Sequence, residues 1–241
     1  MRYAIFSDVH SNLEAFAAVL EFCKNQRVDK FIFLGDIVGY GADPVESLEL
    51  LKTLSAVCVC GNHDLAMIDK FDLAYFNANA IAAINWTKPR LNDEAKDYLG
   101  LLPLIYEGEN FTCVHGSLDK PIEFNYVKTS DDAMKNFILL EKNILFVGHS
   151  HYQWVCESSG DLITENTDDH IPLSPRSRYI VNVGSVGQPR DGDWRPPACI
   201  YDTDDNLISF TRIAYDVETA AKKIVDAGLP SFLATRLFKG E

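Results

Sequence analysis

An α/β fold is predicted by the order of apolar segments in this 241-residue sequence. Over roughly the first sixty residues, short apolar runs typical of buried strands alternate with helical patterns, as in parallel strands joined by right-handed crossovers. After about residue 152, strand-like runs follow one another across short turns, which indicates antiparallel hairpins. We therefore expect a parallel first sheet and a second, mostly antiparallel sheet.

The first sixty residues contain three strand-like runs and capping signals for two helices. Strands are expected at residues 3–6, 31–34 and 56–60. Ser11 and Glu14 form a capping-box pattern before an apolar helical stripe. Asp43 and Pro44 have the character of an N-cap and first-turn proline, so a second helix should begin there.

The segment 65–104 contains helical patterns and no strand run, so we interpret it as a helical insertion. It could shape access to a site, or it could simply cover the sheet. Strands are then expected at 111–114 and 144–147, with a helix at 130–141 between them.

The last part, about 152–241, should hold the second-sheet hairpins and a carboxy-terminal helix. A Ser-Ser-Gly-Asp turn at 158–161 should join two of these strands, and the polar segment 167–178 is expected to be a mobile loop. Asp216 is the expected N-cap of the last helix, with a stop at Gly228 and Pro230. We expect residues 1–241 to form a single domain.

Composition narrows the class of protein. The sequence is 47% hydrophobic and 24% charged, and no run is long enough to span a membrane. Its beginning, MRYAIFSDVH, has the pattern of a strand and not of a secretion signal, so a cytoplasmic location is expected. The six cysteines lie within apolar runs, which favours reduced core thiols. A net charge of −13 argues against binding a nucleic-acid backbone or an anionic membrane.

Polar residues follow five of the apolar runs directly. Five of the six histidines lie just past such a run, and only His170 does not. The metal-binding candidates at these strand ends are Asp8, His10, Asp36, Asn62, His115, His149 and His151.

Oxygen and imidazole donors without thiolates suit divalent ions such as Mn²⁺, Fe²⁺ or Zn²⁺. Seven donors are too many for one ion, so we expect two ions, about 3.5–4 Å apart, sharing a carboxylate and a water whose pKa falls toward about 7. Two dications, two aspartates and a hydroxide leave a charge of about +1, which would attract a phosphoryl group for in-line attack. Two such ions would also change the net charge from −13 to about −9, so the acidity of the chain does not exclude a phosphate substrate.

Other hydrolase chemistries lack their motifs. The sequence has no Gly-x-x-x-x-Gly-Lys-Ser/Thr loop and no Gly-x-Ser-x-Gly elbow. A His-x-His-x-Asp-His metal motif is also missing.

The ordered blocks Asp8-x-His10, Gly-Asp-x-x-Gly-Tyr-Gly (35–41), Gly-Asn-His-Asp (61–64), His-Gly (115–116) and Gly-His-Ser-His (148–151) resemble the calcineurin-like metallophosphoesterase family. The segment 182–191 and the tail from residue 214 further resemble its small bacterial phosphoesterases, although Val183 stands where relatives often carry proline. The resemblance implies a four-layer αββα sandwich of two mixed sheets flanked by helices, with the site at the strand tips. Its cofactors would be two divalent metal ions, among Mn²⁺, Fe²⁺/Fe³⁺, Zn²⁺ or Ni²⁺.

The resemblance also assigns roles by position. Asp8, His10, Asp36 and His151 would hold the first metal, and Asp36 would bridge to a second held with Asn62, His115 and His149. His63 would contact the phosphate and assist the leaving group, with Asp64 as its orienting partner.

Several of these residues have simpler interpretations. Asp64 could be only a helix cap, and Tyr40 and Arg190, which with Asn12 are our candidates for substrate binding, could be structural. His170 in its polar segment is best explained as a solvated loop residue.

Two function classes follow. The first is a phosphoesterase acting on a phosphomonoester, phosphodiester, dinucleoside polyphosphate or phosphoprotein. The second is a non-catalytic metal-binding scaffold that uses the same fold for protein interaction. The presence of His63 with all seven donors favours turnover, and a nuclease would need a basic groove.

Overall fold

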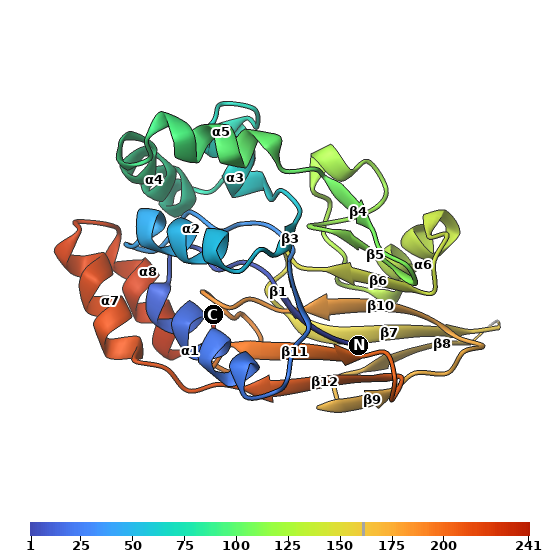
Figure 1. Ribbon diagram of the computed structural model, residues 1–241. Coiled ribbons are helices and arrows are strands. Elements are labelled where there is room, and N and C mark those ends of the chain that lie inside the picture. The colour runs from blue at the N-terminus through green and yellow to red at the C-terminus, as the bar shows by residue number, and fades with distance from the viewer. Residues whose placement is uncertain (161) are drawn as a thin grey trace.

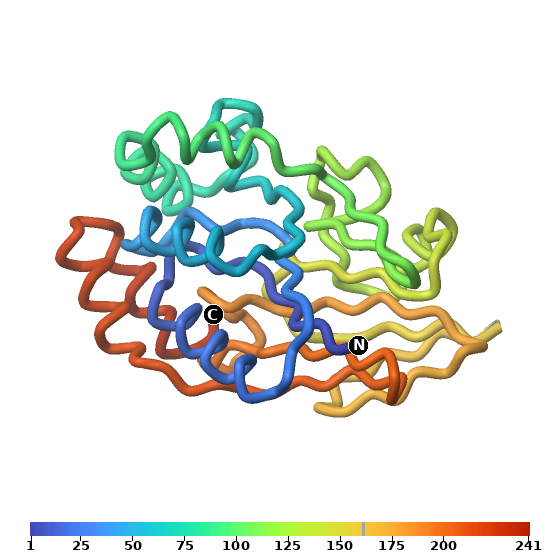
Figure 2. The backbone as a smooth tube through the Cα atoms, in the orientation of Figure 1, coloured from blue at the N-terminus to red at the C-terminus, as the bar shows by residue number. Residues whose placement is uncertain are grey.

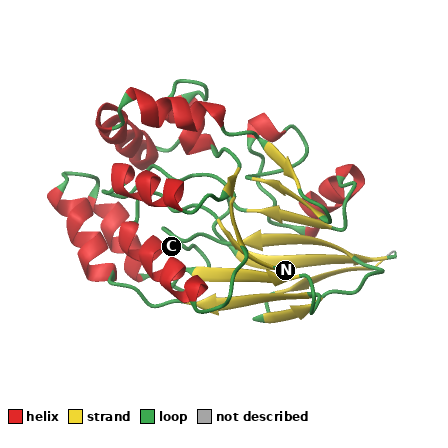
Figure 3. Cartoon of the chain, in the orientation of Figure 1, coloured by secondary structure: helices red, strands yellow, loops and turns green. Residues whose placement is uncertain are grey.

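The computed structural model describes residues 1–160 and 162–241. The described strands form two six-stranded sheets, with helices packed on their outer faces (Figures 1 and 3). This is the α/β arrangement of two mixed sheets flanked by helices that the sequence resemblance implied.

The first sheet is parallel on one side and antiparallel on the other. Its order is β3 (Val57–Cys58), β2 (Lys30–Phe33), β1 (Arg2–Phe6), β11 (Pro197–Asp202), β12 (Leu207–Arg212) and β9 (His170–Pro172). The first three strands run parallel, and Ile5 of β1 pairs with Ile32 of β2 on one side and with Cys199 of β11 on the other. Strand β1 therefore lies at the change from parallel to antiparallel pairing.

The second sheet has the same mixed character. Its order is β4 (Ile105–Glu107), β5 (Phe111–Val114), β6 (Ile144–Val147), β10 (Arg178–Val183), β7 (Gln153–Ser159) and β8 (Leu162–Asn166). Strands β5, β6 and β10 are parallel, and the outer strands are antiparallel.

The two sheets bury a common apolar layer between them. Ile5 and Ile32 of the first sheet belong to one cluster with Phe146 and Val181 of the second, and each of these side chains is at most 1% exposed. Full burial of such a side chain contributes about 1.5–3 kcal/mol, so this layer fixes how the sheets lie on each other.

The helices cover the outer faces. They are α1 (Leu13–Lys24), α2 (Pro44–Thr53), α3 (Asn62–Met67), α4 (Ala78–Thr87), α5 (Asp93–Leu101), α6 (Ser130–Leu139), α7 (Val217–Asp226) and α8 (Ser231–Thr235), with 3-10 turns η1 (Leu73–Tyr75), η2 (Lys88–Arg90), η3 (Pro121–Glu123) and η4 (Arg236–Phe238). Helices α1, α2, α4 and α5 pack in the cluster on the first sheet, and α6 packs on the second. The segment 65–104 is helical as expected and forms the cyan to green group above α2 in Figure 2.

Sequence patterns misplaced some strands. The carboxy-terminal hairpins do not form a sheet of their own: β7, β8 and β10 join β5 and β6, whereas β11 and β12 extend the parallel strands of the first sheet. Local alternation identifies a strand but carries no information about its distant partner, which is why these assignments were wrong.

Three local predictions also need correction. The cap of α1 is Asn12, whose side chain accepts a hydrogen bond from the Ala15 amide, and Ser11 instead adopts a left-handed backbone with φ of 56°. The expected loop 167–178 contains β9, which pairs with β12. Strand β3 is only two residues long.

Other local expectations hold. Asp216 caps α7 by accepting from the Thr219 amide, and the helix ends two residues before Gly228. The last residue of the expected Ser-Ser-Gly-Asp turn, Asp161, lies outside the described residues. All six cysteines are buried free thiols. Within the described ranges, no helix is long and apolar enough to cross a membrane.

Candidate metal centre

Side chains from both sheets meet where the parallel strands end. Asp8 follows β1, Asp36 follows β2, and His115 follows β5. The two sheets are joined here directly, because the amide of His149, just after β6, donates to Asp8 Oδ2 at 2.9 Å. All seven candidate ligands are at most 8% exposed. Residues separated by up to 143 positions thus share one buried site.

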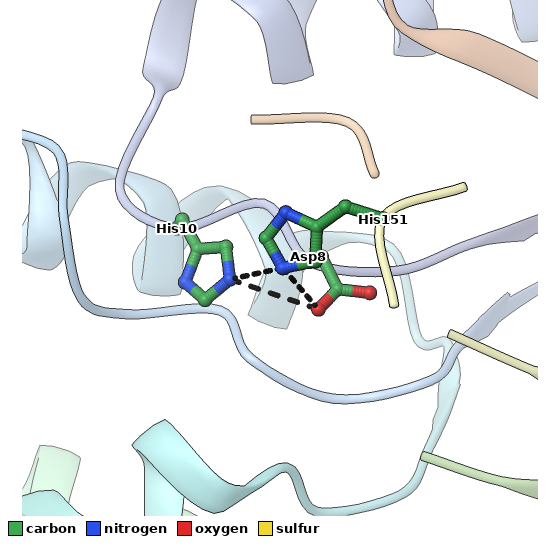
Figure 4. A group of neighbouring side chains, drawn as sticks. All are labelled: Asp8, His10 and His151. Atoms are coloured by element: carbon green, nitrogen blue, oxygen red, sulfur yellow. Dashed lines mark hydrogen bonds and ion pairs between the residues drawn. The ribbon is translucent and has the colours of Figure 1, made fainter. Parts of the chain in front are cut away.

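One group consists of Asp8, His10 and His151 (Figure 4). Asp8 Oδ1 lies 3.1 Å from His151 Nε2 and 3.6 Å from His10 Nε2. The two Nε2 atoms are 3.2 Å apart. Ligands held at about 2.1 Å from one ion are separated by about 3.0–3.4 Å in octahedral or tetrahedral geometry, so these spacings suit a shared cation.

A second group consists of Asp36, His115 and His149, whose donor atoms lie within 4.8 Å of one another. His115 Nε2 is 3.3 Å from Asp36 Oδ2. The two groups adjoin, since His10 Nε2 lies 3.7 Å from Asp36 Oδ2 and His115 Nε2 lies 3.9 Å from Asp8 Oδ1. Asp36 therefore contacts imidazoles of both groups.

Backbone carbonyls orient three of the imidazoles. Nδ1 of His10, His115 and His151 lies 3.0, 2.7 and 2.6 Å from the carbonyl oxygens of Val38, Leu34 and Gln188, respectively. A hydrogen bond to a carbonyl places the proton on Nδ1, so in the neutral ring the Nε2 lone pair faces the site. Two such lone pairs, on His10 and His151, then face each other at 3.2 Å, and a bound cation would relieve their repulsion.

Other buried donors also point to a cation. Among the described residues, Asp8 Oδ1, Asn62 Oδ1 and His115 Nε2 are buried without a hydrogen-bond partner. Burying such atoms unpaired costs about 1–3 kcal/mol each, and more for a charged group. Metal coordination would satisfy all three, so the donor set fits divalent ions.

The local field favours cations. Burial opposes ionisation of Asp8, but the imidazoles of His151 and His115 hold the pKa of its carboxyl well below the usual range. Burial likewise opposes ionisation of Asp36, and the imidazole of His115 lowers the pKa of that carboxyl. Both aspartates are therefore anionic at neutral pH, as metal ligands must be.

The backbone at the site is unusual. Asp8, His10, Asp36, His149 and His151 all have positive φ, between 48° and 65°. This left-handed region is unfavourable for residues with a side chain, and such strain of about 1–3 kcal/mol per residue clusters at functional sites. The glycines next to them allow close approach: a Cβ on Gly61 would lie 2.0 Å from Asp36 Oδ1.

His63 lines the cavity and forms a third candidate group with His10 and Asp36, their donor atoms lying within 4.8 Å of one another. Asp64 does not orient it. Asp64 Oδ2 accepts from the amides of Asp36 and Gly61 at 2.8 and 3.0 Å, and its Oδ1 accepts from the amide of Ile37 at 3.0 Å. The expected pairing with His63 is not seen: the carboxylate is bound by these amides, and His63 Nδ1 has no hydrogen-bond partner among the described residues. Asp64 caps α3 and ties the Gly-Asn-His-Asp turn to the loop that carries Asp36.

Aromatic rings surround His63 instead. Its ring centroid lies 4.7 Å from that of Tyr40 and 4.8 Å from that of Phe76. Burial lowers the pKa of His63 to about 3, so the ring is neutral, and its Nδ1 has no hydrogen-bond partner within the described residues. A neutral imidazole can donate one N–H to an oxygen in the cavity.

The three expected substrate-binding residues have different positions. Tyr40 and Arg190 line a cavity of about 570 Å³ that opens above the metal-binding candidates. Arg190 Nη2 donates to Gln188 Oε1 at 2.8 Å, and its Nε is unpaired among the described groups. Asn12 does not line this cavity: it caps α1, and its Nδ2 donates to the Gly187 carbonyl. We do not retain Asn12 as a substrate-binding residue.

The sequence did not predict the aromatic walls of the cavity or the contact between the Gln188 carbonyl and His151. Tyr126 stacks on His149 with ring centroids 4.2 Å apart, and Phe76 packs against His63. Neither follows an apolar strand, so the strand-end signal could not find them. His170 lies in β9, exposed and 3.2 Å from Ser209 Oγ, outside both groups.

Comparison with known proteins identifies the family to which this chain belongs. The profile of the calcineurin-like phosphoesterase superfamily domain matches residues 1–206. The chain belongs to this superfamily, and with it to the metal-dependent phosphoesterases, which are hydrolases.

Three known proteins match nearly the whole chain. An uncharacterized protein of Methanocaldococcus jannaschii is 41% identical over 243 residues, which covers 98% of this chain and 97% of that protein. The crystal structure of a metallophosphoesterase from Sphaerobacter thermophilus has a TM-score of 0.88 at 38% identity, covering 100% of this chain and 99% of that one. A hypothetical protein of Pyrococcus horikoshii shares the fold, with a TM-score of 0.81 at 20% identity and coverage of 100% and 98%.

Proposed function

We propose that this protein hydrolyses a phosphate ester or phosphoanhydride with the aid of two divalent cations. The ligands would be Asp8, His10, Asp36 and His151 for one ion, and Asp36, Asn62, His115 and His149 for the other. The observation that carries this proposal is the meeting of two adjoining Asp/His groups, with unpaired buried donors, on the floor of an open cavity.

The cations, when bound, would supply an acidified water at neutral pH and offset the negative charge of the phosphoryl group. Side chains of the protein would bind the phosphoryl group and assist the leaving group. Arg190 at the cavity wall would donate to a phosphoryl oxygen. His63 would donate its ring N–H to the oxygen of the leaving group as the P–O bond breaks and the oxygen of water bonds to phosphorus.

Several observations support turnover over a purely structural metal site. The cavity is open to substrate, and it is lined by His63 and Arg190 beside the candidate ligands. A scaffold would not need a neutral imidazole without a hydrogen-bond partner next to the metal groups.

The test is hydrolysis by chelator-treated protein reloaded with Mn²⁺, Fe²⁺, Zn²⁺ or Ni²⁺ singly. The panel would contain p-nitrophenyl phosphate, its bis-ester, nucleotides, dinucleoside polyphosphates and a phosphopeptide. His63→Ala should lower kcat about 10²–10⁴-fold with unchanged metal content. His170→Ala, which alters an exposed histidine outside the site, is the control and should leave kcat unchanged.

A fully metal-loaded protein without activity on the whole panel would overturn the proposal. That result would favour the alternative of a metal-binding scaffold for protein interaction.

A further inference from the structure

Part of the cavity that adjoins the metal-binding candidates is lined by aromatic side chains. Phe71, Tyr75 and Phe76 come from the helical insertion, and Phe124 and Tyr126 come from the segment after η3. Phe71 joins the two sides, since its ring centroid lies 5.2 Å from that of Phe124 in an edge-to-face arrangement. The two aromatic segments therefore form one wall, and this wall lines the same cavity as Asp36, His149 and His151.

One of these rings is exposed where burial would be expected. Tyr75 is 80% exposed, although it lines the cavity and its centroid lies 5.4 Å from that of the partly buried Phe71. Because it is exposed, the Tyr75 ring contributes little to folding through burial. It packs on Phe71 at the mouth of the cavity, where it is available to a ligand.

Tyr126 is less available. His149 stacks on its ring at 4.2 Å, and Lys128 Nζ lies 4.1 Å from its centroid. These two neighbours fix Tyr126 as a wall of the cavity, which leaves Tyr75 as the ring most open to a ligand. Lys128, next to Tyr126, and Arg190, in the cavity lining, add positive charge near the cavity of an otherwise acidic protein. This positive charge suits a phosphorylated ligand.

We propose that Tyr75 forms a base-stacking subsite, so that the substrates of this site are nucleotides: the phosphate lies on the floor and the base stacks at the mouth. This inference rests on the proposed function for the position of the phosphate. Aromatic rings recognise the planar face of any base, and a cavity of about 570 Å³ lies within the usual range for small-molecule sites.

A nucleotide fits better than a phosphotyrosine peptide. The candidate ligands are at most 8% exposed, whereas Tyr75 is 80% exposed, so floor and stacking ring lie at different depths. In a nucleotide the ribose separates the phosphate from the planar base and can span this difference. In phosphotyrosine the ring is bonded directly to the phosphate ester oxygen and would remain near the floor.

The experiment measures binding without turnover. The metal-loaded protein is titrated by calorimetry with two phosphonate analogues that cannot be hydrolysed, one of adenosine 5′-monophosphate and one of ribose 5-phosphate. They differ only in the base, and we expect the adenosine analogue to bind about tenfold more tightly or better. Tyr75→Ala should remove most of this ratio and leave the affinity for the ribose analogue unchanged.

Two further variants separate stacking from a general surface effect. Tyr75→Phe keeps the ring and should keep the ratio. Phe238→Ala removes a 48% exposed ring outside the cavity and should change neither affinity.

Equal affinities in the wild-type protein would overturn the subsite, as would a ratio that Tyr75→Ala leaves intact or a phosphotyrosine peptide that binds more tightly than both analogues. The hydrolysis panel decides the proposed function separately, because a protein that cleaves esters without preferring nucleotides retains the function and loses the subsite.

Discussion

The carboxylate of Asp64 should be a main support of the metal centre, and Asp64→Asn tests this. The side chain is fully buried, and its two oxygens accept three backbone N–H groups at 2.8–3.0 Å. These amides belong to Gly61, Asp36 and Ile37, so one carboxylate joins the turn before α3 to the loop after β2.

The expected loss can be estimated from these three bonds. An asparagine whose oxygen takes the place of Oδ2 keeps the bonds from Asp36 and Gly61 but places its NH₂ group against the amide of Ile37. The lost charge-assisted bond contributes about 2 kcal/mol, and the other two weaken as the acceptor loses its charge, for a total of about 3–4 kcal/mol. For a chain of this length the melting temperature should fall by roughly 6–15 °C.

The assay is urea unfolding followed by circular dichroism at pH 8 with chelator present, so that metal does not contribute. Burial raises the pKa of Asp64 to about 7, and pH 8 keeps the wild-type carboxylate ionised. The control is Asp72→Asn, which changes an exposed cap of η1 to another good cap residue and should leave stability unchanged. A loss below about 1 kcal/mol for Asp64→Asn would refute this account of how the loops are held.

Three other outcomes are expected. Mn²⁺ added to the chelator-treated protein at about a thousandfold its Kd should stabilise the fold by about 4 kcal/mol for each occupied site. The melting temperature, measured by calorimetry, should rise by roughly 8–16 °C for each site. An unchanged melting temperature would contradict metal binding. Gly148→Ala would place a Cβ 2.1 Å from Ser7 Oγ and 2.6 Å from Asp8 Oδ2. The free energy of unfolding should therefore fall by about 1–3 kcal/mol, and metal titration should show a weaker affinity. Wild-type values for both quantities would show that the loop accommodates the methyl group. Arg190→Gln should raise KM for phosphate esters about tenfold or more with stability little changed, and an unchanged KM would assign Arg190 a structural role.

Local sequence signals identified the strands and the strand-end residues well. Asp8, Asp36 and His115 each follow an apolar run, and because parallel strands end at the same edge of a sheet, these side chains could be expected to meet. The bounds of β5 and β6 were predicted correctly, each from a run of four mostly apolar residues.

Partners distant in sequence could not be predicted in the same way. Whether β11 pairs with β1 depends on how the two sheets bury their common faces, and no local pattern contains that information. The same holds for Asp64: its position beside His63 in the sequence suggested a pair, but α3 turns its carboxylate toward three amides. The aromatic wall depends on two segments, around Tyr75 and Tyr126, whose meeting is a tertiary property.

We propose that two divalent ions bind side by side at the ends of β1, β2, β3, β5 and β6. The most direct measurement is an anomalous difference map from crystals of the manganese-loaded protein. We expect two neighbouring peaks, one among Asp8, His10 and His151 and one among Asp36, His115 and His149. A single peak, or ions bound only elsewhere, would contradict it.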